Sequence, residues 1–160
     1  MILRIIAVGH LREKYWQDAA ADFARRLRPY LRLVTEEVAE ARIKDNASPA
    51  EERKAMQQEA LAISERLKKH RGPVVVLDRT GRALDSPGLA AWMNEAVLGG
   101  AAEAAFIIGG PLGLAPEMIE RADLLLSFSR MTFPHQMMRV ILLEQIYRSC
   151  RIMRGEPYHK

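Results

Sequence analysis

Short apolar runs alternate with amphipathic helical stretches along this sequence, and this alternation constrains the fold more than any other feature. Two parallel strands need a crossover connection between them, and that connection is usually a helix. The pattern therefore predicts an α/β fold with a mostly parallel sheet flanked by helices. We expect strands at residues 2–9, 31–38, 74–78, 104–108 and 124–128. We expect helices at residues 14–27, 49–69, 86–98, 116–121 and 134–153.

The length of 160 residues predicts a single domain, 1–160. No apolar run approaches the ~20 residues that a membrane span needs, and Arg4 interrupts the first apolar run, so we expect neither a membrane segment nor a secretion signal. The one cysteine, Cys150, excludes an internal disulfide and is typical of a cytoplasmic protein. Its neighbours Ile146 and Met153 favour a buried structural thiol over a nucleophile.

The net charge of +4 is concentrated at the C-terminal end of the chain. Residues 128–160 contain six basic and two acidic side chains, so they carry the whole excess of positive charge. A basic surface of this kind either faces a polyanion such as RNA or is simply a solvated helix face. The charge pattern leaves both interpretations open.

Three of the predicted strands end in unusual segments, at residues 77–81, 109–113 and 129–134. Ligands in open α/β sheets bind outside the carboxyl ends of the strands, so we expect these segments to surround one crevice. Their glycines let the main chain approach a ligand closely. The Gly109–Pro111 turn fits neither the dinucleotide fingerprint nor the phosphate-binding loop, and taken alone it could be a tight strand-to-helix turn.

Ionisable side chains gather on the last predicted helix and on the tail after it. Arg148 and Arg151 lie one turn apart and could contact phosphates or a developing anion. Glu144 precedes Arg148 by four residues, so it either forms a structural ion pair or positions that arginine. His135 is either a helix cap or core partner, or a side chain of the site. The tail 157–160 brings an aromatic ring, a titratable ring and a cation to a chain end, where side chains are usually featureless.

Four stretches together resemble a known family. They are I-I-A-V-G-H-L-R-E-K-Y-W, I-I-G-G-P-L-G-L, S-F-S-R-M-T-F-P-H-Q-M-M-R-V-I-L-L-E-Q-I-Y-R and P-Y-H-K, and the resemblance spans the whole chain. They are similar to those of the SPOUT-class methyltransferases that modify a pseudouridine of large-subunit ribosomal RNA (the methyltransferase H family). The resemblance implies methyl transfer from S-adenosylmethionine to N3 of a pseudouridine in 23S rRNA, with assembled ribosomes as the substrate. It also implies a deep trefoil knot at the C-terminal end and a homodimer whose interface borders the active site.

The resemblance also implies which loops hold the cofactor. A neutral adenine needs apolar walls with main-chain donors and acceptors, and loops poor in charged side chains provide them. The implied cofactor-binding residues are Leu77, Gly109, Gly110, Phe128, Ser129, Arg130, Met131, Thr132 and Phe133.

A sulfonium methyl donor is already activated, so the predicted reaction needs no metal, and the sequence has no cluster with the spacing of metal ligands. The reaction needs alignment of the two substrates and removal of the weakly acidic imide proton of the base. We predict His159 as the proton acceptor, Arg148 as the electrostatic stabiliser and Tyr158 as a platform for base stacking, with His135 as a further catalytic candidate. The predicted substrate-binding residues are Arg139, Arg151 and Glu144.

Two other classes of function compete with this interpretation. A non-catalytic module that binds RNA or ribosomes would use the basic C-terminal surface alone and would not bind S-adenosylmethionine. A nicotinamide oxidoreductase is disfavoured because the sequence lacks both the glycine fingerprint and the acidic residue expected after it.

Overall fold

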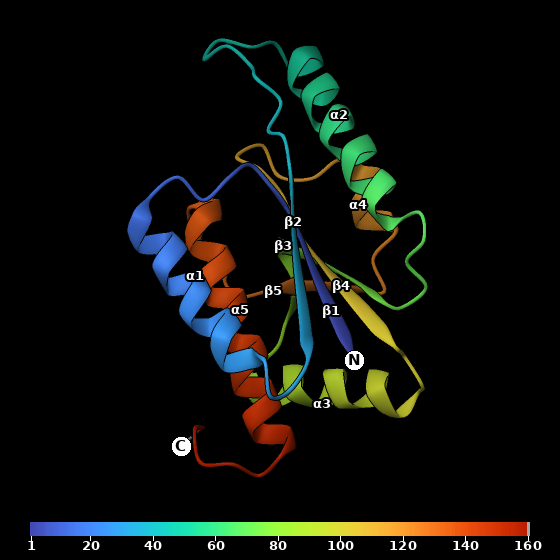
Figure 1. Cartoon of the computed structure of the whole chain (residues 1–160). Helices are drawn as coiled ribbons and strands as arrows, with labels where there is room; N and C mark the ends of the chain where they lie inside the picture. The colour runs from blue at the N-terminus through green and yellow to red at the C-terminus, as the bar shows by residue number, and fades with distance from the viewer. Residues whose placement is uncertain (160) are drawn as a thin grey trace.

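The computed structural model describes residues 1–159, and the predicted tail cation, Lys160, lies outside the described residues. Five parallel strands form one sheet in the order β2-β1-β4-β3-β5 (Figure 1). The prediction of a mostly parallel α/β sheet is therefore confirmed. The strands are β1 Ile2–Val8, β2 Arg32–Val38, β3 Val74–Ala83, β4 Glu103–Ile108 and β5 Leu124–Ser127.

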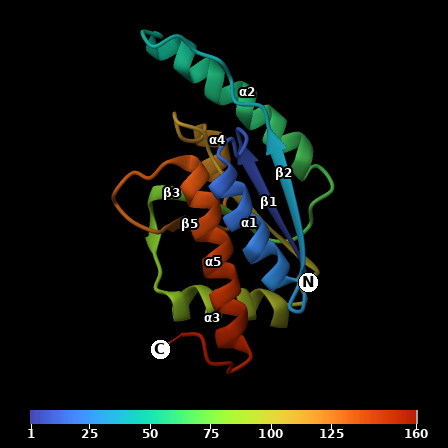
Figure 2. The same ribbon diagram turned by 60° about the vertical axis from the view of Figure 1, so that its left-hand side comes forward.

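Helices cover both faces of the sheet, as Figures 1 and 2 show. On one face α1, α3 and α5 pack together over one apolar core, and on the other face α2 and α4 cover a second core. None of the helices formed by residues 1–159 is long and apolar enough to cross a membrane. Their bounds are α1 Lys14–Leu27, α2 Pro49–Leu67, α3 Ser86–Leu98, α4 Pro116–Glu120 and α5 His135–Met153.

The central strand β4 is buried on both faces, which explains its uninterrupted apolar sequence. Successive side chains of a strand point to opposite faces. Phe106 and Ile108 accordingly join the core under α1, α3 and α5, whereas Ala105 and Ile107 join the core under α2 and α4. This arrangement leaves the carboxyl ends of the inner strands free to carry loops.

Helix α2 begins at the capping box that the sequence predicts. The Ser48 side chain accepts a hydrogen bond from the Glu51 amide, the Glu51 side chain accepts one from the Ser48 amide, and Pro49 is the first helical residue. The other predicted helices end within two residues of their predicted bounds, and α5 begins at His135 instead of Pro134.

The predicted end of the third strand is wrong, because β3 continues past residue 78 to Ala83. The register against β5 shifts between Leu77 and Arg82, so the intervening residues form a bulge in a continuing strand. The Asp78 carboxylate closes this bulge by accepting hydrogen bonds from the Thr80 amide at 2.8 Å and hydroxyl at 2.6 Å. A Cβ on Gly81 would lie 2.6 Å from the Leu125 carbonyl oxygen, so the close approach of the two strands requires glycine.

Candidate active site

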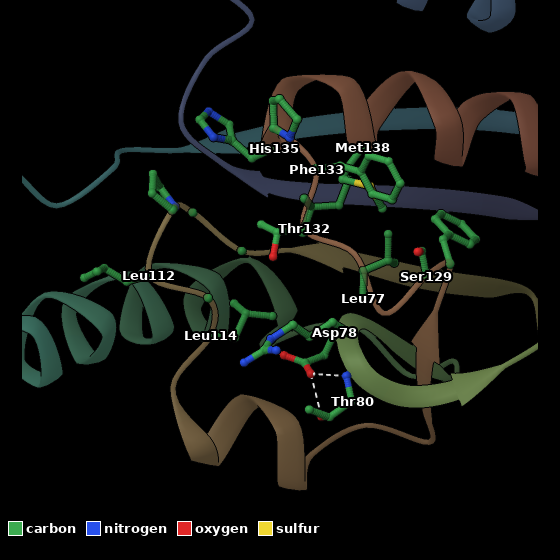
Figure 3. A pocket seen from close by; sticks show the side chains of 18 of the residues that line it. Leu77, Asp78, Thr80, Leu112, Leu114, Ser129, Thr132, Phe133, His135 and Met138 are labelled. Carbon is green, nitrogen blue, oxygen red and sulfur yellow. Dashed lines mark hydrogen bonds between the residues drawn. The ribbon is translucent and has the colours of Figure 1, made fainter.

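The three predicted segments surround one pocket of about 850 Å³ at the bulge in β3 and the carboxyl ends of β4 and β5. Figure 3 shows Leu77, Leu114, Phe133 and Thr132 around this hollow. Among the predicted cofactor-binding residues, Arg130 is exposed and does not line the pocket. The predicted residues that the structure does bring together there are Leu77, Gly109, Gly110, Phe128, Ser129, Met131, Thr132 and Phe133.

Main-chain atoms form the floor of this pocket where two glycines follow β4. A Cβ on Gly109 would lie 2.8 Å from Leu114 Cγ and 2.9 Å from the Gly113 carbonyl oxygen. A Cβ on Gly110 would lie 3.0 Å from Val8 Cγ1. Because no side chain fits there, the walls offer main-chain polar groups between apolar side chains. These residues therefore fit the adenosine part of the cofactor that the family resemblance implies.

The buried Ser127 ties two of the pocket loops together. Its hydroxyl lies 3.2 Å from the Arg79 carbonyl oxygen and 3.1 Å from the Ser129 carbonyl oxygen, so it can donate to either. The Ser129 hydroxyl in turn accepts a hydrogen bond from the Met131 amide at 3.0 Å. Sequence reasoning missed Ser127, although a lone hydroxyl at the end of the run Leu124–Leu126 was a possible signal.

Sequence reasoning also missed several apolar residues that line the pocket. As apolar residues of strands, short helices and α5, they could not be told from ordinary core residues. Their positions at strand ends and one turn into α5 were the available signal. They are Ile108, Leu114, Ile119, Leu126 and Met138.

His135, the predicted catalytic candidate at the start of α5, is half-buried and lines the pocket. Its side chain does not cap the helix. Burial is the main cause that lowers the pKa of His135, Glu40 opposes this shift, and Arg139 and Arg12 add to it. The imidazole is therefore kept neutral to lower pH than an exposed histidine, as a proton acceptor requires.

The sequence predicts Arg139 as a substrate-binding residue, but the structure buries its side chain away from any substrate. This residue is 2% exposed. Its guanidinium donates hydrogen bonds to the carbonyl oxygens of Val8 at 3.0 Å and Gly9 at 2.5 Å, and pairs with the Glu37 carboxylate at 2.5 Å. Arg139 therefore anchors the N-terminal part of α5, and with it the pocket segment just before this helix, to the ends of β1 and β2.

The predicted tail residues form a separate cluster on α5. Arg148 forms an ion pair with Glu144, in which Nε and Nη2 lie 3.0 Å and 2.5 Å from Oε1. The Tyr158 hydroxyl donates to the same oxygen at 3.2 Å, and the Arg148 guanidinium lies 4.7 Å from the centre of the Tyr158 ring. Burial and the neighbouring Glu144 carboxylate raise the pKa of Tyr158. Of the two roles that the sequence allows for Glu144, the structure therefore shows the ion pair with Arg148.

Arg151, predicted beside Arg148 as a substrate contact, holds the start of the tail instead. Its guanidinium pairs with Glu156 at 2.8 Å and donates to the Tyr147 hydroxyl at 3.0 Å and to the Pro157 carbonyl oxygen at 3.3 Å. Arg148 and Arg151 therefore have different partners and do not form a joint anion site within the described chain.

The last described tail residue borders a hollow that is separate from the cofactor pocket. His159 is exposed and borders a hollow of about 430 Å³ that Gln145 of α5 and Phe128 also line. Leu126 and Phe128 line both this hollow and the cofactor pocket. Of the predicted catalytic residues within 1–159, one copy of the chain brings His135 into the pocket but not Arg148, Tyr158 or His159.

Residues 1–159 contain no group of three or more His, Cys, Asp or Glu side chains placed to hold a metal ion. Cys150 is buried on α5, and burial raises the pKa of its thiol to about 11. Cys150 is thus a structural thiol, as its sequence position indicates.

A buried carboxyl lies directly behind the Gly110 wall of the pocket. Glu59 of α2 is 4% exposed, and its Oε1 accepts a hydrogen bond from the Ala41 amide at 2.9 Å. Its Oε2 has no hydrogen-bond partner among residues 1–159 and lies 3.4 Å from where a Cβ on Gly110 would be. Burial is the main cause that raises the pKa of Glu59.

We therefore expect Glu59→Gln to stabilise the fold by about 1 kcal/mol at pH 7, because an amide removes the cost of a buried, unpaired charge. A raised folded-state pKa means that wild-type stability falls as pH rises from the ordinary carboxyl pKa through the folded one. The amide that replaces the carboxyl cannot ionise, so the advantage of the variant should be larger at pH 7 than at pH 4. Urea unfolding at both pH values checks this, with the exposed Glu65→Gln on the same helix as control; a pH-independent difference would contradict it.

Comparison with known proteins agrees with the site. A parallel sheet with a main-chain-lined pocket at its strand ends is the architecture of an α/β protein that binds its ligand outside the carboxyl ends of the strands. The family model described as "Predicted SPOUT methyltransferase" matches residues 1–159, and the chain belongs to the SPOUT methyltransferase family. In particular, it is 46% identical over 160 residues to the ribosomal RNA large subunit methyltransferase H of Carboxydothermus hydrogenoformans, and the match covers 100% of both chains.

One similar solved structure is that of the SpoU methyltransferase AviRb of Streptomyces viridochromogenes in complex with AdoMet. It is 10% identical to this chain with a TM-score of 0.41, and the match covers 97% of this chain and 61% of that one, so the chain spans less than two thirds of AviRb. The family assignment from the sequence is confirmed by the family model and by the bacterial relative. The C-terminal trefoil knot, which this family implies, stays a prediction.

Proposed function

We propose that this chain transfers a methyl group from S-adenosylmethionine to N3 of a pseudouridine in 23S rRNA, on assembled ribosomes in the cytoplasm. The main support for this proposal is the pocket at the strand ends, in whose wall Gly109 and Gly110 leave no room for a side chain. Full-length similarity to a ribosomal RNA large subunit methyltransferase supports the substrate class. We further propose that residues 1–160 act as one domain and that the active form is a homodimer.

The cofactor supplies a methyl group activated by its sulfonium charge. The chain holds it through the main chain of Gly109 and Gly110 and through residues 128–133, which line the pocket except for Arg130. Ser127 ties the start of the segment 128–133 to Arg79, and Arg139 anchors the helix that follows this segment, so this wall of the pocket is held in place. The remaining task is to remove the imide proton of the base and to stabilise the resulting negative charge, which we assign to His159 and Arg148.

The position of the tail supports the homodimer. Arg148, Tyr158 and His159 do not line the pocket of the same chain, and His159 borders a separate hollow. A second copy that presents its own tail to this pocket would complete the site. Half-buried apolar residues on α5, Ile141 and Ile152, offer contact surface for such a copy.

The test of the reaction is transfer of labelled methyl groups to intact ribosomes from a strain that lacks the enzyme, followed by mass mapping of the modified nucleoside. We expect label on a single pseudouridine of 23S rRNA. Label only on small-subunit rRNA or on protein would reject the substrate assignment. Calorimetry with S-adenosylmethionine separates the enzyme from a non-catalytic ribosome-binding module, because the module would give no binding heat.

His159→Ala is expected to lower kcat by about 100-fold or more, because a positioned general base contributes roughly 10²–10⁴ in rate. Arg148→Ala should also lower kcat, since it removes both the stabilising charge and the cation over the Tyr158 ring. Tyr158→Phe is the matched control for stacking, because it keeps the ring and loses only the hydrogen bond to Glu144. Steady-state methylation kinetics measure these effects, and the affinity for S-adenosylmethionine, measured by calorimetry, shows whether the cofactor pocket is intact. Full activity in His159→Ala would show that His159 is not the general base.

A further inference from the structure

A second hollow, of about 770 Å³, lies where β1 and β2 begin and α1 ends. Since all strands are parallel, this edge of the sheet is opposite the one that carries the cofactor pocket. Figure 1 shows the turn from α1 to β2 beside the C-terminal end of α5. Arg28, Tyr30 and Arg32 line the hollow together with uncharged residues, and we call it the basic cleft.

The charge of the basic cleft is not compensated locally. Asp22, which precedes the cleft in the chain, pairs with Arg25 and Arg26, and Glu156, which contacts Tyr30, pairs with Arg151. The exposed Arg28 and Arg32 are left without an ion-pair partner among residues 1–159. Two free guanidinium groups at one cleft attract an anion with repeated charges.

The turn that carries Arg28 is held rigidly. The amides of Tyr30 and Leu31 donate to the Leu27 carbonyl oxygen at 2.9 Å and 3.1 Å. The Tyr30 hydroxyl donates to Glu156 at 2.5 Å, and the Arg154 guanidinium lies 4.5 Å from the centre of the Tyr30 ring. Because Arg154 also donates to the Pro29 carbonyl oxygen at 3.1 Å, the turn is fastened to the segment that leads into the tail.

We propose that the basic cleft binds the sugar-phosphate backbone of ribosomal RNA, as a contact remote from the cofactor pocket. The nature of this partner rests on the proposed function. Arg28 and Arg32 contact phosphates, and Tyr30 keeps the cleft in register with the tail through Glu156. The Tyr147 ring lies between those of Tyr30 and Tyr158, with centroid distances of 5.8 Å and 4.9 Å, so the cleft adjoins the tail residue assigned to base stacking.

The test is the double variant Arg28→Gln/Arg32→Gln, with binding to purified ribosomes measured between 50 and 200 mM salt. Each phosphate contact contributes roughly 0.7–0.9 to the slope of log K against log salt, so we expect the slope to fall by about 1.4–1.8. Arg53→Gln is the matched control, because Arg53 is exposed on α2, on the other face of the sheet. Calorimetric affinity for S-adenosylmethionine should be unchanged in both variants, which shows that the pocket is intact.

An unchanged slope in the double variant, or an equal fall in Arg53→Gln, would overturn the proposal. Methyl transfer by the wild type is measured separately on the same ribosomes. Binding that depends on the basic cleft without any methyl transfer would reject the proposed reaction and keep the cleft. Methyl transfer together with an unchanged slope would reject the cleft alone.

Discussion

Arg139→Met is expected to lower the free energy of unfolding by about 3–5 kcal/mol, the range for breaking a buried ion pair by removal of one partner. Methionine fills a comparable volume, so the loss comes from the polar contacts. The buried carbonyl oxygens of Val8 and Gly9 would each lose a charged donor, and the partly exposed Glu37 carboxylate would lose its ion-pair partner. Urea unfolding measures the change, and Arg53→Met on the surface of α2 should stay within about 0.5 kcal/mol of wild type.

The same substitution should alter the dependence of stability on pH. Burial opposes ionisation of Glu37, but hydrogen bonds from His10 and Arg139 outweigh it and lower its pKa. The stability contributed by ionised Glu37 is therefore present above its ordinary pKa and is lost as pH falls through the lowered pKa. Without Arg139, the fall in the free energy of unfolding at acidic pH should be smaller. A loss of less than about 1 kcal/mol at pH 7 with an unchanged pH profile would show that Arg139 is not an anchor.

The arrangement of elements could be predicted because local patterns determine it. The helical spacing of residues 14–27 and the apolar run before Gly109 each reflect one element packed on one sheet. The bulge at residues 78–81 could not be predicted in this way. It arises because Arg82 and Ala83 pair with β5, more than 40 residues further along the chain, and glycine signals a loop and a bulge equally well.

The location of the pocket was likewise predictable, because strand ends of a parallel sheet meet at one edge. The surroundings of individual charged side chains could not be predicted from the sequence. Arg139 looks like any surface arginine of a basic helix, and its burial depends on Glu37 and Val8, over 100 residues away. The separation of the tail from the pocket depends on which side of Phe128 the chain returns, and no local pattern carries that information.

Gly109→Ala is expected to weaken S-adenosylmethionine binding by about 10- to 100-fold. The new methyl group would lie 2.8 Å from Leu114 Cγ and 2.9 Å from the Gly113 carbonyl oxygen. Both distances are shorter than nonbonded contacts of a methyl carbon allow. Leu114 can move only into the pocket or into the core, and overpacking of this kind costs about 1–3 kcal/mol. Because residues 109–114 form one wall of the pocket, we expect the shift to narrow it.

Calorimetric titration with S-adenosylmethionine measures this loss, and unfolding by urea shows how much of the effect is on the fold itself. Gly99→Ala is the matched control: Gly99 ends α3 away from the pocket, and its new Cβ would lie 3.2 Å from the Glu95 carbonyl oxygen. That variant should bind the cofactor like wild type even if it loses some stability. Normal cofactor affinity in a folded Gly109→Ala protein would mean that the turn after β4 does not form the cofactor wall, and the assignment of the pocket would have to be given up.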